Sequence, residues 1–337
     1  MDFIIGTYTR SFTSEGIYRV SLEAGVLGDP HLLAAADNPS FVVRHPELNV
    51  VYAVIETGDT WPSGGGVVCY RDEGDRLVET GRFESGGADP CHLTVREDGS
   101  ALYVSNYSSG VLTAIALSPD GALQDQVTRI AHEGSGPNKR QASPHVHSSC
   151  VAGDQLLVAD LGIDAVVGYP LDESSMPIAT AAMRYPMAPG AGPRHLCRDG
   201  NTLFVINELD STVATIDLSD GNVVTPVSTL PAGWQGSNDC AEIAMSPDGR
   251  FVYGSNRGHD SIVVFAVAGG TLTQVDVVPS GGAHPRHFLV LPDFVIVANR
   301  DSDNLVLFER DDETGRIRQC GALSLPAPVC IVPPAAR

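Results

Sequence analysis

The chain has 337 residues, of which 43% are hydrophobic and 18% are charged, so it can form a folded core and is not intrinsically disordered. Its 21 Lys and Arg against 41 Asp and Glu give a formal net charge of −20, which argues against a nucleic acid or an anionic membrane as a partner, since both need a basic surface. No apolar run approaches the roughly 18 residues that a membrane helix needs. A small anionic substrate is still compatible with this charge, because a few arginines in one cleft can oppose it locally.

The first residues and the cysteines both point to a reducing compartment. Residues 1–6 have no basic segment, no long apolar segment and no small-residue cleavage site, so we expect a cytoplasmic protein without a secretory signal. The seven cysteines are odd in number and include no Cys-x-x-Cys pair. This usage favours reduced, mostly buried thiols over a disulfide framework or a zinc site.

In chain order, the sequence predicts a repeated pair of β-strands, each pair joined by a small polar turn. The copies are expected in residues 3–18, 51–54, 102–112, 157–167, 203–213, 252–264 and 295–307. The copy at 51–54 is the weakest. Val, Ile and Tyr dominate these runs, and 35 Gly with 23 Pro interrupt the chain, which excludes a helical solenoid.

A second repeated segment, usually opened by a proline, precedes each of these strand pairs by about ten residues. Its copies begin near Pro39, Pro90, Pro144, Pro193, Asp239, Pro285 and Pro328. Successive copies are 43 to 54 residues apart, which is the spacing of β-propeller blades with one four-stranded sheet each.

The two repeated segments are out of phase at the chain ends. Residues 327–332 have no partner strand after them, and residues 3–7 have no proline segment before them. We therefore expect the two ends to complete one blade together, which closes the ring and leaves no open sheet edge. The sequence predicts an all-β protein: a single seven-bladed propeller domain covering residues 1–337.

This geometry gathers side chains at one mouth of the ring. The strand after each proline (strand A) and the next strand (strand B) form an antiparallel hairpin, so the start of A lies beside the end of B. The A-starts supply His92, His145, His147, Arg194, His195, Arg286 and His287. The B-ends supply Asn106, Asp160, Asn207, Glu208, Asn256, Arg257, Asn299 and Arg300.

Four arginines, the carboxylate of Glu208 and several imidazoles are more than turn geometry requires at these positions. Arginine clusters recognise carboxylate or phosphate through paired hydrogen bonds, and glutamate and histidine can transfer protons. Structural roles stay open for each group: an ion pair between Arg194 and Glu208, a turn contact for Arg257 and a core position for His147. Arg300 and residues 139–140 are interpreted as loop charges unless they touch substrate.

Several motifs resemble the lactonase-type family of seven-bladed propellers, which contains bacterial 6-phosphogluconolactonases and a fungal carboxy-muconate cycloisomerase. These motifs are Gly-Pro-Arg-His-Leu at 192–196, Val-Ile-Asn-Glu-Leu at 205–209, Ser-Asn-Arg-Gly-His-Asp-Ser-Ile at 255–262 and Pro-Arg-His-Phe at 285–288. Residues 6–9 and 136–148 are similar to its larger bacterial branch. The chain departs from the family pattern at residues 151–154 and at Arg300, where a neutral residue is more common.

The resemblance implies catalytic roles for His147, Arg194, Glu208 and Arg257, with no metal and no organic cofactor. Residues expected to contact substrate are His145, His195, Arg286, His287, Arg300 and Asn256. The pair His145 and His147 is weak evidence for a metal, because no carboxylate accompanies it.

The leading hypothesis is hydrolysis of a lactone, with 6-phosphoglucono-δ-lactone as the expected substrate. Glu208 would activate the water, with His147 as an alternative base or as proton donor, while Arg194 and Arg257 would hold the phosphate or the oxyanion. A serine nucleophile is disfavoured because Gly-x-Ser-x-Gly is absent. The alternatives are a cycloisomerase that acts on a carboxy-muconate-type lactone and a non-catalytic binding propeller. The oligomeric state is left open.

Overall fold

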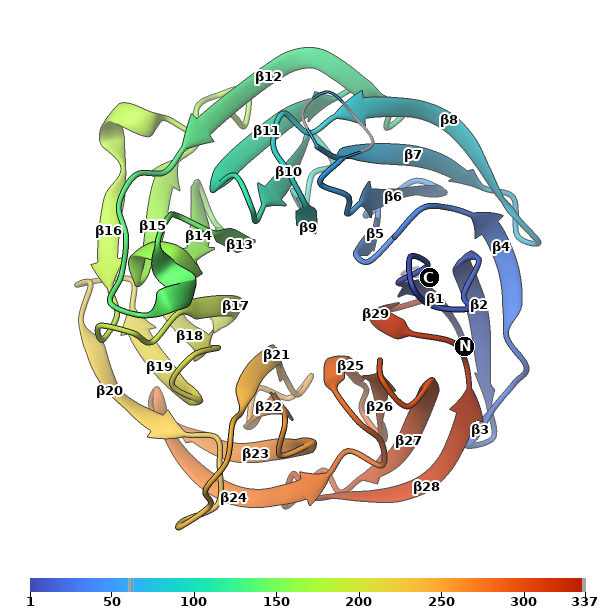
Figure 1. Cartoon of the computed structure of the whole chain (residues 1–337), viewed down its shortest axis with the longest axis vertical. Coiled ribbons are helices and arrows are strands. Elements are labelled where there is room, and N and C mark those ends of the chain that lie inside the picture. The colour runs from blue at the N-terminus through green and yellow to red at the C-terminus, as the bar shows by residue number, and fades with distance from the viewer. Residues whose placement is uncertain (60–61, 63, 335–337) are drawn as a thin grey trace.

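The computed structural model describes residues 1–59, 62 and 64–334 and arranges them as a ring of seven blades (Figure 1). Each blade is an antiparallel sheet whose first strand lies at the central channel and whose last strand lies at the rim. The prediction of an all-β, seven-bladed propeller is therefore confirmed. No helix in the described part of the chain is long and apolar enough to cross a membrane.

Six of the blades are each made from four consecutive strands. From the channel outward, and in chain order, they are β5 (Val42–Arg44), β6 (Val50–Ile55), β7 (Gly66–Asp72) and β8 (Leu77–Glu84); β9 (Pro90–Val95), β10 (Ala101–Asn106), β11 (Val111–Leu117) and β12 (Leu123–Ala131); β13 (Val146–Ala152), β14 (Gln155–Asp160), β15 (Ala165–Pro170) and β16 (Met183–Pro186); β17 (Pro193–Asp199), β18 (Thr202–Asn207), β19 (Thr212–Asp217) and β20 (Val223–Ser228); β21 (Asp239–Met245), β22 (Phe251–Arg257), β23 (Ser261–Ala268) and β24 (Thr271–Pro279); β25 (Pro285–Val290), β26 (Phe294–Asn299), β27 (Asn304–Arg310) and β28 (Ile317–Ser324).

The remaining blade joins the two ends of the chain. The last strand, β29 (Pro328–Val332), pairs with β1 (Asp2–Thr7), and β1 pairs with β2 (Gly16–Glu23). Two further strands, β3 (Val26–Leu27) and β4 (His31–Ala35), pair with β2. Ile5 lies opposite Ile331 and Gly6 opposite Cys330, so the ring closes in the way that the phase of the repeats predicts.

Among the described residues, three short 3₁₀ helices lie in connections between strands: η1 (Lys139–Gln141), η2 (Leu161–Ile163) and η3 (Ala179–Ala181). The first of them follows β12 and is well anchored. Asn138 accepts a hydrogen bond from the Arg140 amide, and the Gln141 side chain accepts one from the Asn138 amide. Gln141 is also fully buried and donates to the Leu161 carbonyl.

The core consists of apolar layers between neighbouring blades, because each sheet has two faces and both must be covered. Tyrosines in the second strand of three blades illustrate the packing. Tyr52, Tyr103 and Tyr253 are fully buried, and each hydroxyl donates to a turn carbonyl of the next blade at 2.6–2.9 Å. The buried hydroxyls are thus satisfied, and neighbouring blades are tied together at the end far from the site described below.

We predict that the ring unfolds as one cooperative unit that depends on β29. Deleting residues 328–337 removes the partner of β1 and exposes Ile4, Ile5 and their apolar neighbours, so the melting temperature should fall by about 10 °C or more. Thermal unfolding monitored by circular dichroism measures this change. An unchanged melting temperature contradicts the closure.

A milder pair of variants gives the matched comparison. Cys330→Ala alters a buried residue of β29, whereas Cys320→Ala makes the same change at an exposed position of β28. The first should lower the melting temperature and the second should not.

Candidate active site

Irregular pairing of the innermost strands aims side chains into the channel. In β17, Pro193 pairs with Asn207 and His195 pairs with Ile206, which leaves Arg194 as an extra, unpaired residue between them. The same one-residue irregularity recurs at His147 in β13, at Arg286 in β25 and at Cys91 in β9. Such bulges break the strict alternation of a strand and redirect a side chain.

Glu208, the residue that follows β18, is the centre of the site. Its carboxylate contacts three guanidinium groups: Arg194 Nε lies 2.9 Å from Oε2, Arg257 Nη2 lies 2.8 Å from Oε2, and Arg140 Nη2 donates to Oε1. The carboxylate side chain is only 3% exposed. Two blades and the connection that contains η1 therefore meet at one buried carboxylate.

The charges of this cluster determine which protonation states are present. Burial by itself would raise the pKa of Glu208, but Arg257, Arg194 and Arg140 outweigh burial and lower the pKa to about 2. Burial, together with Arg257 and Arg286, lowers the pKa of Arg194 to about 10. Glu208 is thus a carboxylate and Arg194 a cation near neutral pH.

His147 lies next to this cluster. Its Nε2 is 3.9 Å from Glu208 Oε2, and its ring packs edge-on against Tyr107 at 5.3 Å between ring centroids. Burial, and then the charge of Arg194, hold the pKa of His147 well below its usual value, so the ring is neutral. His145 lies at the same mouth, and its ring stacks on that of Tyr107 with 4.5 Å between the ring centroids.

The candidates His195 and His287 belong to a second group, which surrounds Glu242. Each of these histidines follows a bulged arginine by one residue on its inner strand. The Nδ1 of His195 is 3.1 Å from the Glu242 carboxylate, and His287 Nε2 is 3.2 Å from it. Burial raises the pKa of Glu242, although His287 and Arg194 oppose the rise. The sequence places His195 and His287 at the mouth, but their side chains contact Glu242 and not Glu208.

Arg286 is on the mouth side and faces another carboxylate. Its Nη2 lies 4.0 Å from Glu56 Oε1, and its guanidinium lies over the Tyr8 ring at 5.1 Å from the centroid. The Tyr8 hydroxyl donates to Glu56 at 2.9 Å. Arg286 is therefore close to the site but is already paired.

Two of the expected substrate contacts are paired with neighbouring side chains. Asn256 is fully buried: its Oδ1 accepts from Thr229 at 2.7 Å and its Nδ2 donates to Ser261 at 3.1 Å, so its side chain holds the turns of the blade together. We therefore correct the expectation that Asn256 contacts substrate. Arg300 follows β26 at the mouth and pairs with Asp301, with Nε 2.6 Å from Oδ1.

Arg140 is the main residue that sequence reasoning missed, because residues 139–140 were interpreted as loop charges. Besides Glu208, its guanidinium contacts Asp239, with Nη1 3.1 Å from Oδ1. The signal in the sequence was the spacing of Asn138 and Gln141, a capping-box pattern that indicates an ordered turn. Glu242 was also missed, since the repeat marks only A-starts and B-ends.

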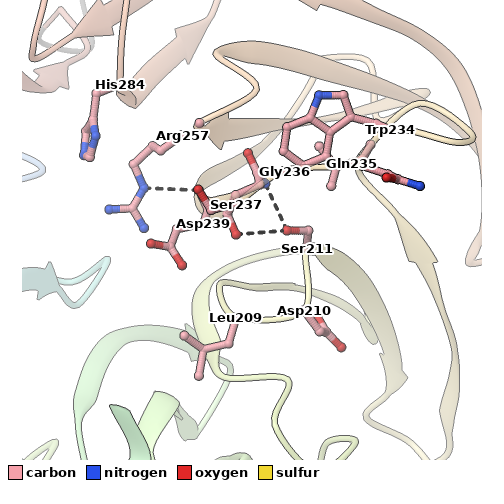
Figure 2. A pocket seen from close by; sticks show the side chains of 13 residues that line it. Leu209, Asp210, Ser211, Trp234, Gln235, Gly236, Ser237, Asp239, Arg257 and His284 are labelled. Carbon is pink, nitrogen blue, oxygen red and sulfur yellow. Dashed lines mark hydrogen bonds between the residues drawn. The ribbon is translucent and has the colours of Figure 1, made fainter. Parts of the chain in front are cut away.

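A cavity of about 620 Å³ opens beside this cluster (Figure 2). In this view Asp239, Arg257 and His284 lie on the left, Trp234 lies on the right and Leu209 lies below. Arg257 both lines the cavity and contacts Glu208, so this side chain connects the cavity to the buried carboxylate. The volume is suitable for a small ligand such as a sugar derivative.

A second cavity of about 680 Å³ lies at the other end of the channel, where the inner strands end. Glu242 and His287 line it together with many apolar side chains, but none of its lining residues contacts Glu208. In the described part of the chain, no three His, Cys, Asp or Glu side chains are arranged to hold a metal ion.

Comparison with known proteins agrees with this architecture. The family model "Lactonase, 7-bladed beta-propeller" matches residues 2–333. The chain is 35% identical to the 6-phosphogluconolactonase of Bacillus subtilis over 97% of this chain and 96% of that protein, and 32% identical to the 6-phosphogluconolactonase of Formosa agariphila over 94% of each. The solved structure of the periplasmic gluconolactonase of Pseudomonas aeruginosa superposes with a TM-score of 0.89 at 30% identity, covering 98% of both chains. The chain belongs to the lactonase family of seven-bladed β-propellers.

Proposed function

We propose that this enzyme hydrolyses sugar lactones and that its principal substrate is 6-phosphoglucono-δ-lactone, which it converts to 6-phosphogluconate. The observation that carries the proposal is the buried Glu208 carboxylate, held by three arginines beside the neutral imidazole of His147. The relatives named 6-phosphogluconolactonase and gluconolactonase support lactones as the substrate class. The three arginines around Glu208 outnumber the two carboxylates that they contact, those of Glu208 and Asp239. This excess of positive charge supports an anionic substrate.

In the proposed reaction, a water oxygen attacks the lactone carbonyl carbon while Glu208 takes the water proton. Arg194 and Arg257 stabilise the negative charge that develops on the carbonyl oxygen. The bond between the carbonyl carbon and the ring oxygen then breaks, and the ring oxygen receives the proton from Glu208. The product carboxylic acid ionises and releases one proton. His147, 3.9 Å from Glu208, orients the water or replaces Glu208 as the base.

We also propose that the enzyme works in the cytoplasm. All seven cysteines are free thiols, which is typical of a reducing compartment. The periplasmic relative from Pseudomonas aeruginosa is the reason to test this directly, by fractionating the cells that express the protein.

A panel of lactones tests the proposed substrate. The phosphorylated gluconolactone should be hydrolysed with the highest kcat/KM, plain gluconolactone more slowly, and carboxy-muconolactone should show neither hydrolysis nor isomerisation. Activity should persist after chelator treatment, because the proposed chemistry uses only side chains. Isomerisation of the muconolactone, or a loss of activity that Ca²⁺ or Zn²⁺ restores, contradicts the proposal.

The role of Glu208 is tested with Glu208→Gln, which preserves size but removes the base. We expect kcat to fall by roughly 10²-fold or more, with little change in KM, because the carboxylate is not expected to bind an anionic substrate. Steady-state kinetics on the phosphorylated lactone measure both quantities.

Two variants accompany that measurement. Glu242→Gln makes the same change at a buried carboxylate that pairs with histidines, and it should lower kcat far less. If Glu208→Gln keeps near-normal kcat while His147→Ala abolishes turnover, the base is His147. If neither change affects hydrolysis, this mouth is not the active site.

The two buried arginines should affect substrate binding as well as the rate. Arg194→Ala and Arg257→Ala should each raise KM strongly, and the one that faces the oxyanion should also lower kcat. Because both arginines neutralise Glu208, each variant also needs a melting curve to show that it is folded. Unchanged KM and kcat in both folded variants contradict a role in substrate binding.

A further inference from the structure

The three arginines around Glu208 are held in different ways. Arg194 is 2% exposed and donates to the Ala241 carbonyl at 2.7 Å. Arg257 likewise donates to a backbone carbonyl, that of Cys240, at 2.7 Å. These two side chains are therefore fixed by the backbone of β21 and cannot leave Glu208 without losing buried hydrogen bonds.

Arg140 is bound only through side chains in the described part of the chain. Its guanidinium contacts Glu208, Asp239 and, at 3.5 Å, the hydroxyl of Tyr107. Its side chain is 35% exposed, far more than those of the other two arginines. The backbone at Arg140 is anchored through η1, so the guanidinium can move while its attachment point stays in place.

The charges in this group do not balance. Three guanidinium groups face the carboxylates of Glu208 and Asp239, which leaves one positive charge uncompensated within the group. Asp239 and Arg257 line the 620 Å³ cavity, and Asp239 pairs with Arg140, so Arg140 lies one ion pair away from the cavity wall. Arg140 is the most exposed of the three arginines, and its forked guanidinium suits phosphate oxygens.

We propose that the phosphate of a phosphorylated sugar lactone takes Arg140 away from Glu208, and that this exchange activates Glu208 as the base. The inference rests on the proposed lactonase activity. It makes the phosphate a contributor to the chemical step as well as to binding.

The physical basis is the competition of two anions for one cation. While three arginines contact Glu208, its pKa is about 2 and the carboxylate is a weak base. Removing one of the three positive charges raises the proton affinity of Glu208, whereas Arg194 and Arg257 remain to stabilise the oxyanion. Binding energy from a part of the substrate that does not react is thereby used in the transition state.

The test supplies the anion separately from the lactone. Wild-type enzyme is assayed with plain gluconolactone and increasing phosphite dianion, which mimics the missing phosphate group. We expect saturable activation of kcat/KM by about 10-fold or more, because phosphite should bind Arg140 and release Glu208. Inhibition by phosphite without activation overturns the proposal, and this measurement needs no variant.

Arg140→Met is the decisive variant. It should abolish phosphite activation, reduce the phosphorylated lactone to about the kcat/KM of the plain one, and hydrolyse plain lactone faster than the wild type does without phosphite. Activation that persists in Arg140→Met overturns the exchange. Arg140→Lys keeps the charge but not the fork and should show weaker activation than the wild type.

Arg300→Met is the matched control, since Arg300 lies at the same mouth but pairs with Asp301. This variant should need a higher phosphite concentration for half-maximal activation, but it should reach the same maximal activation as the wild type. If wild-type enzyme hydrolyses plain and phosphorylated lactones but the activation is absent, only the exchange fails. If it hydrolyses neither lactone, the proposed function itself fails.

Discussion

One buried carboxylate surrounded by guanidinium groups determines how this propeller mouth is organised. A charge as deeply buried as that of Glu208 is tolerable only when it is paired and hydrogen-bonded, and here the partners outnumber it. The same arrangement makes each arginine dependent on Glu208, because Arg194 and Arg257 are themselves buried. Loss of Glu208 leaves the buried Arg194 and Arg257 without a carboxylate partner, and loss of an arginine changes the charge that the others experience. These residues should therefore be studied as a group, and their mutational effects should not add.

The fold brings the group together through ring closure and through bulges. Glu208 follows β18, Arg194 is the bulged residue of β17, Arg257 ends β22, and Arg140 comes from η1 between two blades. In a regular strand, alternation would fix the face of the sheet to which the side chain of Arg194 points. The bulge removes this constraint. Because the ring is closed, the blades cannot splay apart, and the distances across the channel are held by all seven sheets.

Much of this could be predicted from the sequence, since repeats and hairpin geometry are local patterns. The spacing of the prolines predicted the seven blades, and the pairing of A-starts with B-ends predicted that His147, Arg194, Glu208 and Arg257 share one mouth. Depth along the channel could not be predicted, because a bulge shifts a strand by one residue without a reliable sequence signal. His195 was therefore expected at the same mouth as Glu208, whereas its side chain contacts Glu242.

The role of Arg140 could not be read from the strand repeat, because the residue lies in a connection. Its contact with Glu208 spans 68 residues and depends on how η1 packs against its neighbours. Asn256 illustrates the opposite error. It has the right type and position for a ligand contact, but buried amides near turns are commonly used to satisfy other buried polar groups.

The arginine cluster also explains how a strongly acidic protein can accept an anionic substrate. The net charge of −20 repels anions in principle, but at physiological salt the potential of exposed charges decays over about 8 Å. Inside the mouth, the nearest charges are those of the cluster, and burial weakens their screening by salt. The local excess of positive charge therefore governs what binds, while the acidic surface governs solubility. Ionic strength should consequently have less effect on binding at the mouth than the net charge of the protein alone would suggest.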